Sequence, residues 1–124
     1  MSKNIIKIAA VLGTMAVGIG AFGAHGLEEI LVTNGRVGTF QTAVNYHFYH
    51  VLALLAVGIL ANYKPSKLLS YCSLLFTLGI VIFSGSLYIL SLTNITLLGA
   101  ITPLGGVCFI AGWILLFWAM KKAS

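Results

Sequence analysis

The fold is decided by the stretch from Leu68 to Leu92, which reads LLSYCSLLFTLGIVIFSGSLYILSL and contains no charged residue. At a rise of about 1.5 Å per residue, a helix of roughly 25 residues crosses the hydrocarbon core of a bilayer, which is about 30 Å thick. Three other apolar stretches of similar length lie at 5–24, 40–61 and 97–120. A membrane β-barrel would instead need alternating segments of about ten residues, and the sequence has none. The sequence therefore predicts four transmembrane helices in an all-α bundle.

The composition excludes an ordinary water-soluble domain. Hydrophobic residues make up 60% of the 124 residues and charged residues only 7%, whereas a soluble chain carries roughly 25% charged residues. The formal net charge of +5 does not indicate nucleic-acid binding, because the basic residues lie in ones and twos at the ends of apolar stretches and form no patch. Cys72 and Cys108 lie inside apolar stretches, so we expect buried thiols and no disulfide framework.

The charges that flank the apolar stretches predict how the chain crosses the membrane. With four crossings, six lysines lie on one face, and the opposite face carries Arg36 beside Glu28 and Glu29. Because cytoplasmic loops are enriched in Lys and Arg, both termini are predicted to be cytoplasmic. An alternative treats the first stretch as a signal peptide cleaved near Ala21-Phe22-Gly23, which would leave three helices. The six lysines are Lys3, Lys7, Lys64, Lys67, Lys121 and Lys122.

The links between the stretches are short, so residues 1–124 are predicted to form a single transmembrane domain. The longest link joins the first two stretches on the outer face. In it, Leu27, Ile30 and Leu31 recur at helical spacing, which predicts a short amphipathic helix lying in the membrane interface. Asn34-Gly35 is expected to end that helix.

Pro103 and the glycines predict how the helices begin and pack. Either the fourth helix begins at Thr102, with Pro103 in its first turn, or it begins earlier and kinks at Pro103. Small residues at helical spacing allow two membrane helices to approach closely. The residues predicted to do so are Gly13, Gly20, Gly23, Gly105 and Gly106.

Polar residues inside the apolar stretches gather toward the outer face, and the inner half is almost purely apolar. On a helix that starts at Phe40, His50 lies about 15 Å below the outer surface, near mid-membrane. Ionisable side chains at that depth usually face the bundle interior. We therefore predict an outward-facing polar pocket around His50. Its predicted members are His25, Thr42, Tyr46, His50, Ser84, Ser86, Tyr88 and Thr102.

Several interpretations of this cluster remain open. His25, His47 and His50, with Glu28, could bind a metal ion, since imidazole suits zinc, copper or iron. A haem between helices and a proton-titrating cavity are further alternatives. The simplest interpretation is a structural network of hydrogen bonds that holds the helices together. The sequence contains no nucleophile motif, phosphate loop or paired intramembrane carboxylates, so we do not expect an enzyme, and no cofactor is required.

Four ordered motifs resemble a known family. They are GAFGAHGL at 20–27, the segment from Thr42 to Leu55, FSGSLY at 83–88 and ITPLGG at 101–106. Together they are similar to the small membrane family called domain of unknown function 423, which is related to eukaryotic transmembrane protein 256. The resemblance implies four transmembrane helices and a location in the inner or plasma membrane. It implies no particular activity.

The resemblance also changes the ranking of the candidate residues. Family sequences often read Tyr-x-x-Tyr-His where this chain has Tyr46-His47-Phe48-Tyr49-His50. The resemblance thus implies that His47 is incidental, which weakens a metal site built on His47 and His50. The better candidates become His25, Tyr46, His50, Ser86, Tyr88 and Thr102.

The functional expectation is a non-enzymatic membrane protein that binds a small ligand or ion, or conducts protons, through the pocket around His50. Four helices of this length enclose little volume, so a homo-oligomer or another membrane-protein partner in the bilayer is expected. A structural or assembly subunit of a larger membrane complex is the second hypothesis. A metal- or haem-binding redox protein is the third.

Overall fold

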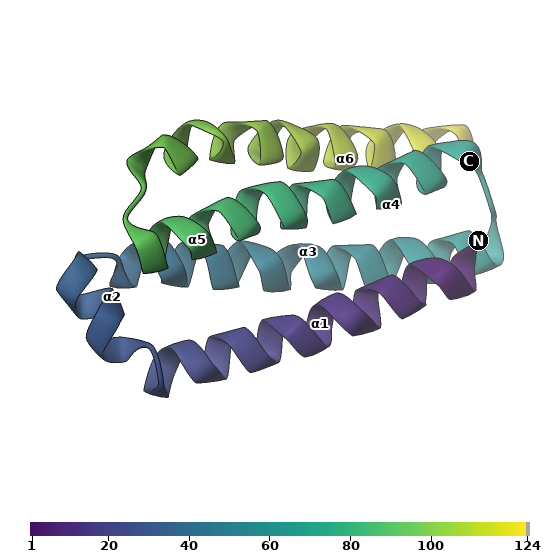
Figure 1. Cartoon of the computed structure of the whole chain (residues 1–124). Helices are drawn as coiled ribbons and strands as arrows, with labels where there is room; N and C mark the ends of the chain where they lie inside the picture. The colour runs from purple at the N-terminus through teal and green to yellow at the C-terminus, as the bar shows by residue number, and fades with distance from the viewer. Residues whose placement is uncertain (124) are drawn as a thin grey trace.

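The computed structural model describes residues 1–123, which form helices and turns with no strand (Figure 1). Four helical spans are long and apolar enough to cross a membrane: Ser2–His25, Val37–Tyr63, Lys67–Thr93 and Thr96–Lys122. Each contains one of the predicted ranges. The predicted all-α, four-helix membrane fold is therefore confirmed. In chain order the elements are α1 (Ser2–His25), α2 (Glu28–Asn34), α3 (Val37–Tyr63), α4 (Lys67–Gly79), the π-helix η1 (Ile80–Ser84), α5 (Gly85–Thr93), the 3-10 helix η2 (Thr96–Ala100) and α6 (Thr102–Ala123).

The spans pack in the order in which they follow along the chain. α1 packs on α3, α3 packs on the third span formed by α4, η1 and α5, and α4 and η1 pack on α6. Among the described helices, α1 and α6 are not a packed pair. Both termini lie at one end of the molecule, and α2 lies at the other (Figure 1). The first and last helices consequently have large surfaces without a helical neighbour.

Glycines allow the closest helix approaches. The Phe40 ring of α3 lies where a side chain on Gly23 would begin, and the main chain of Phe83 in η1 lies against Gly105 of α6. The valine contacts at Gly13 and Gly20 are looser, because an added Cβ would stand 3.3 Å from each valine side chain. At Gly106 the nearest atom would be 3.9 Å away, an ordinary contact. Close packing through small residues thus occurs at both the α1–α3 and the α6–η1 contacts.

A π-helix interrupts the third span. Ser66 caps the start of α4, because its Oγ accepts a hydrogen bond from the Leu69 N–H at 3.2 Å. From Ile80 to Ser84 the backbone then adopts the wider π-helical turn. The Ser84 hydroxyl is fully buried and donates a hydrogen bond to the Ala43 carbonyl of α3 at 2.8 Å. Single π-helical turns inside α-helices are frequent at functional sites.

The short helix predicted in the first outer loop is present as α2. It ends at Gly35, whose φ of 68° is left-handed and favours glycine. The Asn34 side chain donates hydrogen bonds to the Ser91 carbonyl at 3.0 Å and to the Leu92 carbonyl at 3.3 Å. These bonds hold α2 against the end of α5.

The start of the fourth span decides between the two interpretations of Pro103. The 3-10 helix η2 ends at Ala100, and α6 begins at Thr102 with Pro103 in its first turn. Pro103 therefore does not kink a longer helix, and its missing N–H breaks no helical hydrogen bond there.

Candidate functional site

His50 forms the centre of an aromatic cluster between α3 and α6. Its ring stacks on Phe109, with centroids 3.6 Å apart and planes 9° apart. Its Nε2 accepts a hydrogen bond from the Trp113 indole N–H at 3.1 Å, and its Nδ1 lies 2.8 Å from the Tyr46 carbonyl. A carbonyl only accepts and an indole N–H only donates, so the ring is neutral with its proton on Nδ1. His50 thereby joins α3 to α6.

The space around the His50 ring is filled by its neighbours. His50 is only 5% exposed, the Phe109 ring lies against its face, and both its nitrogens already have partners. A second ring proton would displace the Trp113 donor. The arrangement therefore supports the structural interpretation of His50 over a proton relay.

The other predicted pocket residues form separate pairs. Ser86 and Thr102 lie 2.6 Å apart through their hydroxyl oxygens and join α5 to the start of α6. Ser84 bonds to α3, as described above. Tyr88 pairs with His47, with its Oη 2.8 Å from Nδ1. Each of these hydroxyls thus forms a hydrogen bond to a neighbouring helix, and none of them bonds to His50.

Three predicted members lie at exposed positions. His25 is exposed at the end of α1. Thr42 is exposed, and its hydroxyl donates to the Gly38 carbonyl of the preceding turn at 3.0 Å. Tyr46 is 39% exposed and packs on the Phe83 ring, with centroids 4.7 Å apart. The structure therefore separates His25 and Thr42 from His50, whereas the Tyr46 ring stacks beside the His50 ring, with centroids 6.2 Å apart.

The metal candidates are also separated. His47 and His50 point to different neighbours, Tyr88 of α5 and Trp113 of α6. Glu28 lies on α2, at the end of the bundle opposite the termini. Within residues 1–123 no three His, Cys, Asp or Glu side chains lie close enough together to hold a metal ion.

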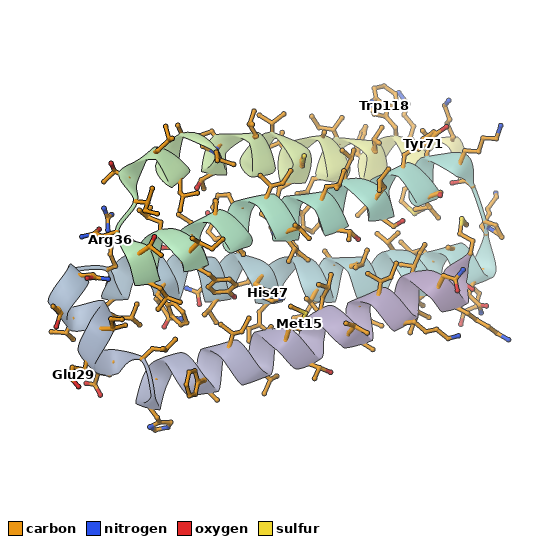
Figure 2. The ribbon with its side chains drawn as sticks, viewed as in Figure 1. Met15, Glu29, Arg36, His47, Tyr71 and Trp118 are labelled. Atoms are coloured by element: carbon orange, nitrogen blue, oxygen red, sulfur yellow. The ribbon has the colours of Figure 1, made fainter. Side chains whose placement is uncertain are left out.

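His47, which the resemblance implied to be incidental, is buried between helices. Its side chain is 2% exposed. Across the described part of the chain, its Nε2 is the one buried side-chain nitrogen or oxygen without a hydrogen-bond partner. The Leu12 carbonyl of α1 faces the ring, but it does not meet hydrogen-bonding distance and angle to Nε2. Figure 2 shows His47 between α3 and α1, with Met15 on the neighbouring helix.

Two hollows flank the α1–α3 contact. The larger, of about 470 Å³, lies between α1, α2 and α3, on the outside of the bundle at the end away from the termini, and Glu28 and Gln41 are among its lining residues. We call it the outer groove. The smaller, of about 190 Å³, lies beside His47 between α1, η1 and α5. We call it the His47 cavity. Neither could be located from the sequence, which predicted only close packing at the small residues of α1.

Sequence reasoning did not find Trp113 and Phe109, the α6 partners of His50. One signal was available for Trp113: an indole N–H inside an uncharged membrane stretch needs an acceptor, and a histidine at similar depth can supply one. Nothing in the sequence indicated that Phe109 would stack on that histidine.

The fold and the polar pairs define a helical integral membrane protein whose buried hydrogen bonds join neighbouring spans. The family model described as "Protein of unknown function (DUF423)" matches residues 19–106, and the chain belongs to this family. The Bacillus subtilis UPF0382 membrane protein YwdK is 50% identical over 123 residues, covering 97% of this chain and 98% of the relative. The Staphylococcus haemolyticus UPF0382 membrane protein SH2409 is 48% identical over 114 residues, covering 92% of each chain.

A more distant relative carries a more specific name. The Escherichia coli K12 UPF0382 inner membrane protein YgdD is 40% identical over 117 residues, covering 93% of this chain and 87% of the relative. No solved structure matches the chain. The predicted family is thus confirmed, and so is the prediction of a membrane protein.

Proposed function

We propose that this protein is a non-enzymatic membrane protein that binds a small amphiphilic ligand in the outer groove. The observation that carries the proposal is the groove itself, whose volume of about 470 Å³ falls in the range of roughly 300–1,000 Å³ that small-molecule sites occupy. The proposal keeps the expectation of an outward-facing site but moves that site away from His50. It requires no metal ion or haem.

The lining of the groove indicates the chemistry of the ligand. Small residues of α1, such as Gly20 and Ala21, leave space beside apolar side chains of α3 such as Phe48. The polar lining includes the exposed carboxylate of Glu28 and the exposed carboxamide of Gln41. Apolar walls with a few polar groups are typical of ligand sites. The groove suits a hydrocarbon body with a cationic or hydrogen-bond-donating head.

Filling the groove tests the proposal. Ala21 is exposed and lines the groove, so Ala21→Trp adds bulk there without entering the α1–α3 contact. Val11→Trp is the matched control, because Val11 is 60% exposed and is not part of the groove lining. Proteins extracted directly into native lipid nanodiscs would be compared by mass spectrometry. The wild type and the control should retain a bound small molecule that Ala21→Trp lacks. Equal retention by all three proteins, or none by the wild type, would contradict the proposal.

We also propose that both termini face the cytoplasm. Lys3, Lys64 and Lys122 lie at one end of the spans and Arg36 at the other, and an even number of crossings leaves both termini on one side. The excess of lysine supports a cytoplasmic location for that side, and the name of the Escherichia coli relative supports the inner membrane. A green fluorescent protein fused at the C-terminus should fluoresce, and alkaline phosphatase fused there should be inactive. The reverse pattern would refute this orientation.

One observation favours assembly as a second function. Because α1 and α6 do not pack on each other, both edges of the helix series are open to a further transmembrane helix. A homo-oligomer or a larger membrane complex would use these edges. Cysteine cross-linking through Val11→Cys on α1 and Ile114→Cys on α6, both of which are exposed, should trap dimers in native membranes. A chain that stays monomeric with either cysteine would count against assembly.

A further inference from the structure

We infer that the His47 cavity binds an apolar carbonyl compound, whose oxygen accepts a hydrogen bond from His47 Nε2 and whose ring occupies the space beside η1. This site lies on the opposite flank of α1 from the outer groove. It involves Leu12, Met15 and Ile19, whereas the groove is lined by Val17 and Ala21 among others. The two sites can therefore be tested independently.

The hydrogen bonding of Tyr88 places the imidazole proton. The one hydrogen-bond partner of the Tyr88 hydroxyl within residues 1–123 is His47 Nδ1, at 2.8 Å. If the hydroxyl donates to Nδ1, the ring proton resides on Nε2, and a single donor remains unpaired. If Nδ1 donates instead, both the hydroxyl hydrogen and the Nε2 lone pair remain unpaired. An unpaired buried polar group costs about 1–3 kcal/mol, so the first arrangement is favoured. It leaves an N–H donor at Nε2.

The surroundings of this donor contain space. His47 and Tyr88 line the cavity together with Gly85, the first residue after the π-helix. A Cβ added at Gly85 would meet nothing within 4 Å. The wide turn of η1 and the bare Gly85 thus leave a hollow at the buried imidazole. Met15 and Val81 also line the cavity and are 48% and 59% exposed, so the hollow opens sideways toward the lipid.

The size and lining define the ligand class. Apart from His47 and Tyr88, the lining side chains are apolar, and the volume of about 190 Å³ is below the roughly 300–1,000 Å³ usual for a whole ligand. The cavity therefore fits one ring-sized group whose remainder extends into the bilayer. A carbonyl oxygen satisfies the Nε2 donor without bringing a second donor or a charge into the membrane. A lipid-soluble quinone ring has this chemistry.

Binding of 2-methyl-1,4-naphthoquinone to the purified protein in nanodiscs tests the inference. The matched ligand is 2-methylnaphthalene, which has the same ring system and methyl group without the carbonyls. Equilibrium dialysis should show saturable binding of the quinone, with an affinity about tenfold above that of the hydrocarbon, since one hydrogen bond is worth up to about that factor. Infrared spectra should show one of the two carbonyl stretches shifted to lower frequency on binding.

Two variants and one control complete the experiment. Gly85→Leu fills the cavity and should abolish saturable quinone binding, whereas Gly18→Leu, at another helical glycine with open space, should leave it unchanged. His47→Phe keeps an aromatic ring but removes the donor, so it should remove the preference for the quinone over the hydrocarbon. If His47→Phe fails to fold, Gly85→Leu and the ligand pair still decide. Equal affinity for the two ligands in the wild type, or undiminished quinone binding by Gly85→Leu, would overturn the inference.

Discussion

Replacing His50 by alanine is expected to destabilise the packing of α3 on α6. The substitution removes the acceptor of the Trp113 indole N–H, and interhelical hydrogen bonds in membranes are worth about 0.6–2 kcal/mol. It also removes the ring stacked on Phe109, and such ring pairs contribute about 0.5–1.5 kcal/mol. The bond to the Tyr46 carbonyl stays within one helical turn and adds little. The expected loss is therefore about 1–4 kcal/mol in the free energy of unfolding.

A double-mutant cycle isolates the hydrogen bond from the stack. His50→Phe keeps a flat ring against Phe109 but cannot accept from Trp113. Trp113→Phe removes the donor and replaces the indole with a smaller ring beside Phe76. Each single change and the pair would be measured by equilibrium unfolding in mixed micelles, with helix content followed by circular dichroism. We expect a coupling energy of about 1 kcal/mol.

The cycle also has an outcome that would refute this reasoning. If the coupling energy lies within about 0.3 kcal/mol of zero, the two side chains act independently and the hydrogen bond contributes nothing. If, in addition, His50→Ala unfolds at the same detergent fraction as the wild type, His50 does not hold the helices together. Its burial would then need a functional explanation.

Three further predictions concern packing and turns, each measured by the same unfolding assay. Gly105→Ala should destabilise the protein by about 1–3 kcal/mol, because the added Cβ would collide with the main chain of η1. The control Gly106→Ala should leave the stability unchanged, since the nearest atom would be 3.9 Å from its Cβ. Equal effects of the two substitutions would contradict the packing. Gly35→Ala should cost about 1–2 kcal/mol of stability, because φ is 68° at this position. Gly38→Ala, inside α3, should be neutral or stabilising. A larger loss of stability at Gly38 than at Gly35 would be inconsistent with the turn. Ser84→Ala should cost about 0.6–2 kcal/mol through loss of its bond to α3, and an unchanged midpoint would show that this bond is dispensable.

The membrane spans could be predicted because lipid demands continuous apolarity over a fixed length, and the sequence displays that directly. The contacts at Gly23 and Gly105 were foreseeable for a related reason, since only small residues allow backbones to approach closely. The short helix α2 followed from three apolar residues at helical spacing and the Asn34-Gly35 end.

The roles of His47 and His50 could not be predicted in the same way. Both lie on α3 three residues apart, so their side chains differ in direction by about 60° around the helix axis. That difference turns His50 toward Trp113 and His47 toward Tyr88. Which neighbour each histidine contacts depends on how α1, the third span and α6 surround α3. The spacing of residues along α3 alone does not contain this information. The π-helical turn at η1 is equally absent from the apolar pattern, because it shifts the backbone without changing the hydropathy.

The neighbour-to-neighbour order of the spans bears on how the chain is made. Each span packs on the one that precedes it, so that neighbour is already present when a new helix leaves the ribosome. The α1–α3 hairpin can form before the third span emerges, and α6 arrives last at a surface that is already built. Such short-range pairing keeps the search for native contacts small, whereas the His50 imidazole on α3 obtains its Trp113 donor only when α6 arrives.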